Sequence, residues 1–247
     1  MTDSSFGGIW AATLASVRRN AELVLPVAGA FLFLPQLGLQ LATSDTPPDQ
    51  WFTGSRSTLI IATFLVVIAV SLVGQLVLAH IAIRDGTGQD QTLGAVIGTS
   101  ASLALPALAA NLMQGIMVGF GLVLLILPGL WLLARFLLVV PIIVRETRDP
   151  IEALKRSWTL TEGNGFRILG MLLVLILGFL LLSLSISGLG AAIGVISTVA
   201  GGQSDAGWGI GRWIFEVLSA GVSAAISVYW VTFVAMLYSA LCVEKAA

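Results

Sequence analysis

Charged side chains that could do chemistry are most concentrated in one short stretch of this 247-residue chain. The segment PIIVRETRDPIEALKRSWTLTEGN, residues 141–164, carries eight of the 25 charged residues, which are 12 Lys and Arg plus 13 Asp and Glu. Side chains at this density could form an active site, in which they act as general acids and bases. They could also form the water-facing segment of a protein that otherwise lies in lipid.

Other residues that commonly do chemistry are too few to form a site. The chain has one histidine, His80, and one cysteine, Cys242, far apart in the sequence, whereas metal sites need several ligands at matched spacing. It also lacks the G-x-S-x-G, P-loop and G-x-G-x-x-G motifs. We therefore predict no catalytic residue, no metal ligand and no cofactor.

The composition favours the lipid interpretation of the charged stretch. The apolar residues AVILMFWYC make up 57% of the chain before its 27 glycines are counted, whereas a soluble domain has roughly 45–50% with glycine included. Most of the chain must therefore lie in hydrocarbon, which predicts an all-α, polytopic membrane protein. No basic stripe suits a nucleic-acid backbone, so we expect membrane lipids and no nucleic acid as partners.

Six apolar windows are candidates for transmembrane helices, because about 20 residues are needed to cross about 30 Å of hydrocarbon. They are residues 23–41, 59–83, 103–127, 130–144, 168–187 and 214–243. The fourth window has only 15 residues and follows Pro128-Gly129, a pair that we expect to end the third helix and reverse the chain tightly.

The basic residues predict the orientation of these spans. With six spans, nine of the 12 basic residues fall on the side of both termini, two fall on the opposite side, and Arg135 lies within the fourth window. By the positive-inside rule we expect both termini to be cytoplasmic.

A short, partly polar helix is predicted ahead of each pair of spans, which suggests three units of one interfacial helix and one hairpin. The first lies near residues 5–20 and the third near residues 150–161, both in the cytoplasmic interface with the apolar side toward the membrane.

The third of these helices accounts for the charged stretch. Asp149 should cap it, Pro150 should occupy its first position, and Glu152 should reach back to the cap. Lys155 and Arg156 would face phosphate headgroups, and Trp158 belongs to the apolar side. This segment is therefore interpreted as a solvated helix rather than a catalytic one.

Polar and small residues inside the spans have two interpretations each. Gln36, Gln75, Asn111 and Gln114 could line a substrate path, although interhelical hydrogen bonds are the more common explanation. Gly115 and Gly119 could bring two chains together, but packing within the chain is the simpler use of this spacing.

Arg135 needs a partner, because a charge at the bilayer centre costs about 2.5–3.5 kcal/mol. If the fourth and sixth spans start at the same surface, Arg135 and Glu216 lie about 7.5 and 4.5 Å below it, within reach of a bidentate pair. The alternatives are free helix-end carbonyls around Pro128 and, third, an anion site at Arg135.

One block resembles a known family. LPGLWLLARFLLVVPIIVRETRDPIEALKRSWTLTEGNGFRILG, residues 127–170, is similar to the glycerophosphoryl diester phosphodiesterase membrane-domain family and to the related YciC-type inner-membrane proteins. The matching positions are Pro128, Gly129, Arg135, Pro141, Glu146, Ala153, Leu154, Arg156, Ser157, Leu160, Thr161, Gly163 and Asn164. The family name refers to a soluble phosphodiesterase domain that follows the membrane part in some members, and its acids and histidines have no counterpart here. The resemblance thus implies a location in a bacterial inner membrane, without the hydrolytic activity.

These observations predict a non-enzymatic membrane module that holds a lipid, or a protein partner at its cytoplasmic face. The alternative is a small transporter or lipid-handling channel, for which Gln75, Asn111, Gln114 and Arg135 would converge on one cavity. A third function, intramembrane phosphodiester hydrolysis, would need water-activating residues that the sequence does not supply.

Overall fold

The computed structural model describes residues 6–43, 46, 50–53, 56–84, 93–199 and 210–246. Across these residues the chain is helical and contains no β-strand. In chain order the helices are α1 (Phe6–Arg19), α2 (Ala21–Ala28), the π-helical turn η1 (Gly29–Phe33), α3 (Leu34–Thr43), α4 (Ser57–Arg84), α5 (Leu93–Ser102), α6 (Ala104–Leu124), α7 (Ile126–Arg135), α8 (Val139–Arg145), α9 (Pro150–Leu160), α10 (Gly165–Val199) and α11 (Ile210–Ala246).

Within the described ranges, six helical segments are long and apolar enough to cross a membrane, which confirms the predicted all-α class. They are Ala21–Thr43, Ser57–Arg84, Ala104–Leu124, Ile126–Arg145, Gly165–Leu189 and Trp213–Lys245. A short helix precedes each pair, since α1 comes before the first two segments, α5 before the next two and α9 before the last two.

The reversal between α6 and α7 differs from the sequence-based prediction. Leu125 makes the turn in an extended conformation, with φ −162° and ψ 142°, whereas Pro128 and Gly129 lie in the first turn of α7. The prediction that Pro128-Gly129 ends the third span is therefore wrong, and the fourth span is longer than 15 residues because α7 starts at Ile126. Proline is tolerated there, since the first N–H groups of a helix have no partner within it.

Gly129 has a different role, which is close packing within the α6–α7 hairpin. A Cβ atom at Gly129 would lie 2.5 Å from the side chain of Leu122, and one at Gly121 would lie 2.9 Å from the Cα atom of Gly129. Gly115 and Gly119, by contrast, have nothing within 4 Å of a Cβ position. The interpretation of Gly115 and Gly119 as an intrachain packing motif is therefore wrong.

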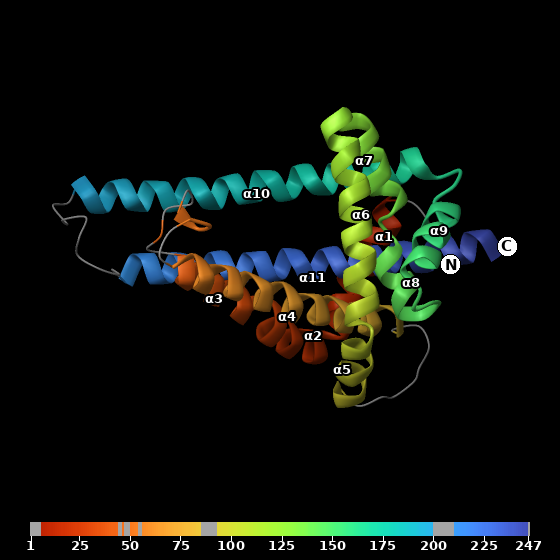
Figure 1. Ribbon diagram of the computed structural model, residues 1–247, viewed down its shortest axis with the longest axis horizontal. Coiled ribbons are helices and arrows are strands. Elements are labelled where there is room, and N and C mark those ends of the chain that lie inside the picture. Colours follow the sequence, from red (N-terminus) through yellow and green to blue (C-terminus); the bar gives the residue numbers. More distant parts are fainter. Residues whose placement is uncertain are drawn as a thin grey trace.

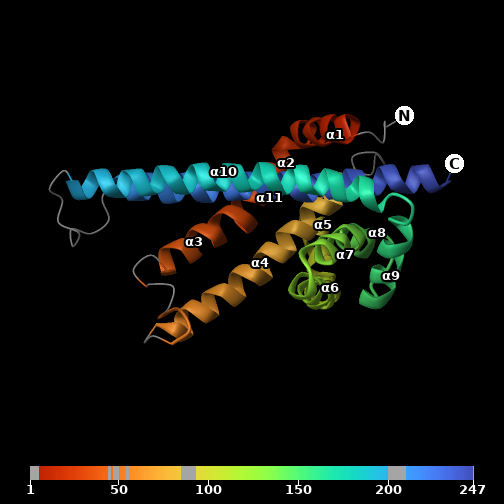
Figure 2. The ribbon, with the colours of Figure 1, turned by 90° about the horizontal axis from the view of Figure 1, so that it is seen from above.

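The α6–α7 hairpin runs across the longest helices instead of alongside them. In Figure 1, α10 and α11 lie along the horizontal axis while α6 and α7 run up the picture. In Figure 2, turned by 90° about that axis, α10 and α11 keep their direction and α6 is seen nearly end-on. The apolar helices therefore do not all follow one axis, which the predicted depths of Arg135 and Glu216 had assumed.

The centre of the fold is the short helix α8 with the turn that precedes it. Leu138, Val139 and Ile142 are fully buried, and α8 contacts α4, α6, α9 and α11. Phe233 and Tyr238 of α11 belong to the same buried cluster. Lipid is as apolar as these side chains, so close dispersion contacts hold them together more than transfer from water does.

Helix α1 packs on α11, so protein covers the side that was predicted to face the membrane interface. Ile9, Thr13 and Ser16 are buried, and the ring of Trp10 lies 4.9 Å from that of Tyr229. Both views show α1 beside the C-terminal half of α11, with α3 and the start of α11 toward the opposite end (Figures 1 and 2).

Candidate functional site

The charged stretch folds as a capped helix, with one difference from the prediction. The Asp149 carboxylate accepts a hydrogen bond from the Ile151 N–H at 2.9 Å, and Pro150 occupies the first position of α9. Glu152 does not reach the backbone of the cap. Its carboxylate instead accepts a 2.6 Å hydrogen bond from the Thr147 hydroxyl, which accepts one from the Asp149 N–H at 3.2 Å.

Most of the apolar side of α9 faces protein and not the membrane, although Ile151 at its start is 53% exposed. Leu154 and Leu160 are 6% and 2% exposed and belong to the central core, and α9 contacts α6, α8 and α11. Lys155 and Arg156 are exposed, as expected for a side that faces water or headgroups. The helix is therefore docked on the bundle.

Glu146 joins three helices at this end of the molecule. Its two carboxylate oxygens accept hydrogen bonds from the Tyr238 hydroxyl at 2.6 Å and from the Arg156 Nε at 2.8 Å. The bond to Glu146 raises the pKa of the Arg156 guanidinium, which is partly offset by its desolvation. The sequence analysis named Glu146 and Arg156, but it did not predict that they pair, and it did not name Tyr238. The available signal for Tyr238 was its hydroxyl in an apolar span, because such a group needs a hydrogen-bond partner.

Arg135 is held by two tryptophans. Its guanidinium carbon lies 4.7 Å from the ring centre of Trp131 and 4.8 Å from that of Trp158, distances typical of cation–π contacts. One Nη donates to the Trp158 carbonyl at 3.3 Å, and the Arg135 carbonyl accepts a 2.7 Å bond from the Ser157 hydroxyl. Arg135 therefore docks the end of α7 on the last turn of α9, where helix carbonyls lack partners within the helix.

The predicted pair between Arg135 and Glu216 is wrong, and so is the alternative partner at the carbonyls around Pro128. Glu216 lies near the start of α11. With the amide nitrogen of Gln40 facing Glu216, that nitrogen donates to the Glu216 backbone carbonyl at 3.1 Å and to the Glu216 carboxylate at 3.0 Å. The pairing failed because α7 crosses α11 and does not start at the same surface.

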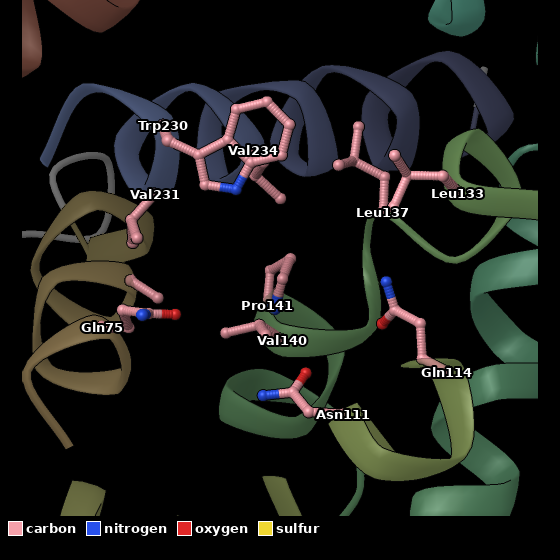
Figure 3. Close-up of a pocket in the computed structure, with 11 residues that line it drawn as sticks. Gln75, Asn111, Gln114, Leu133, Leu137, Val140, Pro141, Trp230, Val231 and Val234 are labelled. Atoms are coloured by element: carbon pink, nitrogen blue, oxygen red, sulfur yellow. The ribbon is translucent and has the colours of Figure 1, made fainter. Parts of the chain in front are cut away.

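The described helices enclose a cavity of about 220 Å³ whose polar lining consists mainly of amides (Figure 3). Gln75 reaches it from α4, and Asn111 and Gln114 reach it from α6, where their spacing of three residues places them on one face. Trp230 of α11 lies across the cavity from them (Figure 3). The remaining lining residues are Ala79, Leu133, Leu137, Val140, Pro141, Val231 and Val234.

None of these three amides makes a hydrogen bond within the described part of the chain, although interhelical bonds were the expected explanation for them. An amide placed in hydrocarbon without a partner costs roughly 2–7 kcal/mol. Each carries two N–H donors and one carbonyl acceptor. The cavity therefore suits a molecule that can both accept and donate hydrogen bonds.

A groove next to the cavity leads toward apolar surface. It has a volume of about 350 Å³ and is lined by Val67, Ile68, Ser71, Leu72, Leu108 and Leu112, together with Gln75 and Asn111, which also line the cavity. Ile68 is 51% exposed and Leu112 is 59% exposed. Gln75 and Asn111 thus stand between the amide-bearing cavity and an apolar groove that opens between α4 and α6.

Three of the four residues that a transport path required therefore converge, and the fourth does not. Gln75, Asn111 and Gln114 share the cavity, whereas Arg135 is held between Trp131 and Trp158. Among the residues that the structure places, no three His, Cys, Asp or Glu side chains come together as a metal site would need.

Comparison with known proteins gives one family match. The model of the membrane domain of glycerophosphoryl diester phosphodiesterase matches residues 102–247, which is more than half of the chain and contains α6 to α11. No curated protein and no solved structure matches the chain. With its six apolar helices, the chain is a multi-pass membrane protein, and it belongs to the family of the membrane domain of glycerophosphoryl diester phosphodiesterase.

Proposed function

We propose that this chain is a non-enzymatic membrane module that binds a lipid, with the headgroup in the amide-lined cavity and the acyl chain in the groove between α4 and α6. One observation carries the proposal: a cavity lined by three amides without a partner in the described chain adjoins a groove of apolar, partly exposed side chains. A ligand that satisfies both must be polar at one end and apolar at the other.

A transporter or channel is less well supported. Such a path needs polar groups that continue across the membrane, but the amides are confined to one cavity and Arg135 is engaged elsewhere. The carboxylate of Glu146 is likewise engaged by Arg156 and Tyr238, and not directed at a bound substrate. These engagements support a binding role without catalysis.

We place the module in a bacterial inner membrane with both termini on the cytoplasmic side. The distribution of nine basic residues against two supports this orientation. The position of α1 beside the C-terminal half of α11 supports two ends on one side (Figures 1 and 2). In this orientation the exposed Lys155 would contact anionic headgroups or a protein partner.

The test compares co-purified lipids in three forms of the protein extracted in native-lipid nanodiscs. The double variant Asn111→Leu, Gln114→Leu removes the amides with little change in volume, and it should fold because these amides have no intrachain hydrogen bonds to lose. Gln36→Leu is the matched control, since it removes an amide from α3 that does not line the cavity.

Mass spectrometry should find one lipid class enriched severalfold over the bulk membrane in the wild type and in Gln36→Leu, and not in the double variant. Identical lipid profiles in all three, each equal to the bulk membrane, would overturn the proposal.

A further inference from the structure

The lining of the cavity also selects the kind of headgroup. We infer that the cavity takes a neutral, hydroxyl-bearing headgroup without phosphate, as in diacylglycerol, rather than the headgroup of a phospholipid. This inference rests on the proposed function, because it names the lipid class for the same site.

None of the eleven described residues that line the cavity is charged, which argues against a charged headgroup. A phosphate in a low-dielectric site needs a cation beside it, and a choline or ethanolamine group needs a carboxylate or a set of aromatic faces. Arg135 does not line the cavity, and Arg84 lies nine residues beyond Gln75 on α4, about 13 Å along the helix.

The hydrogen-bond donors and acceptors of the lining match a hydroxyl group better than an ion. The amides of Gln75, Asn111 and Gln114 together offer six N–H donor positions and three carbonyl acceptors, all outside intrachain hydrogen bonds in the described structure. Phosphate and carboxylate oxygens only accept, so they would leave the amide carbonyls without partners. An ammonium group only donates, so it would leave the N–H groups without partners. A hydroxyl does both and matches an amide lining.

The size of the cavity and its connection to the groove also suit a glycerol headgroup with acyl chains. A volume of about 220 Å³ greatly exceeds the 10–15 Å³, roughly, that one water requires, so several heavy atoms fit. The groove continues from Gln75 and Asn111 to the exposed Ile68 and Leu112, which gives an acyl chain a route to the bilayer. A glycerol headgroup with a free hydroxyl, attached to acyl chains, has this shape.

The experiment measures dissociation constants by native mass spectrometry of the full chain in detergent. The probes are dilauroylglycerol, dilauroyl phosphatidic acid, which adds only a phosphate, and free glycerol, which lacks the chains. The proteins are the wild type, the double variant Asn111→Leu, Gln114→Leu and the control Gln36→Leu.

Dilauroylglycerol should bind the wild type at least about tenfold more tightly than dilauroyl phosphatidic acid, and the double variant should lose about tenfold, the equivalent of one or two hydrogen bonds. Gln36→Leu should match the wild type, and glycerol should not compete at concentrations near that of the lipid.

Each other result has a definite meaning. Tighter, amide-dependent binding of phosphatidic acid would overturn the neutral class and leave lipid binding in place. Competition by free glycerol at the lipid's own concentration would assign the site to a soluble polyol and overturn the lipid. Binding of both lipids with no dependence on the amides would overturn the inference and the proposed function together. If the double variant fails to fold, the preference of the wild type between the two lipids still decides the headgroup class.

Discussion

Replacing Arg135 with Gln should lower the free energy of unfolding by about 3 kcal/mol, because Gln reproduces neither the two ring contacts of the guanidinium nor its charged hydrogen bond to the Trp158 carbonyl. Its distances of 4.7 and 4.8 Å to the rings of Trp131 and Trp158 indicate two cation–π contacts. At a half-buried site each contributes about 1 kcal/mol. The charged hydrogen bond to the Trp158 carbonyl is long, at 3.3 Å, and adds about 1 kcal/mol, below the usual range for such bonds.

A double-mutant cycle with Trp158→Leu separates the ring contact from the hydrogen bond, because that substitution removes the ring and keeps the backbone carbonyl. The expected coupling between Arg135→Gln and Trp158→Leu is about 1 kcal/mol. The assay is equilibrium unfolding of the purified chain in mixed detergent micelles. The control cycle pairs Arg135→Gln with Glu216→Gln and should be additive within about 0.5 kcal/mol. Additivity in the tryptophan cycle, or coupling in the glutamate cycle, would refute the placement of Arg135.

Three further predictions concern topology, packing and activity. Reporter fusions after Thr46 and Ser204 should be external and one after Thr161 internal, because basic residues gather on the internal side; an internal signal at Ser204 would contradict this orientation. Gly129→Ala should lower the free energy of unfolding by about 1–3 kcal/mol, because its Cβ would clash with α6. The control Gly119→Ala should be neutral or stabilising, since nothing lies near its Cβ position. Equal effects of the two variants in the same micelle unfolding assay would contradict the tight hairpin. The purified chain should not hydrolyse glycerophosphodiesters; turnover above a no-protein control that persists through repeated purification would contradict the non-enzymatic proposal.

Hydropathy predicted the helices better than it predicted their directions. The window at residues 59–83 lies within α4, and the window at 214–243 within α11, because the length of an apolar run reflects the thickness of hydrocarbon. The path of α6 and α7 across α11 depends instead on contacts between helices, such as those of α8 with α4, α6, α9 and α11. A one-dimensional pattern does not contain that information.

Among the site residues, the local interactions were predicted correctly and the contacts between distant helices were not. Asp149 and Pro150 acted as predicted because capping is a local interaction, set by residues within one turn. Of the two tryptophans that hold Arg135, Trp158 lies 23 positions away on another helix, so finding it required the relative position of α7 and α9. The amides of Gln75 and Asn111 were recognised as unusual, but only the fold shows that they share a cavity and make no bond to each other.

Because α6 and α7 cross α10 and α11, the number of apolar segments can differ from the number of times the chain crosses the membrane. α10 and α11 have 35 and 37 residues, about 52 and 55 Å in length, and so exceed the roughly 30 Å of hydrocarbon. If they follow the bilayer normal, the α6–α7 hairpin lies along the plane of one leaflet, and four segments cross instead of six. A hairpin that enters and leaves the bilayer on one face adds no crossing. Every other connection therefore stays on the side of the membrane that was predicted for it. Only the tip at Leu125 distinguishes the two arrangements: a cysteine placed there would react with an impermeant external reagent if six segments cross, and would be shielded from it if four do.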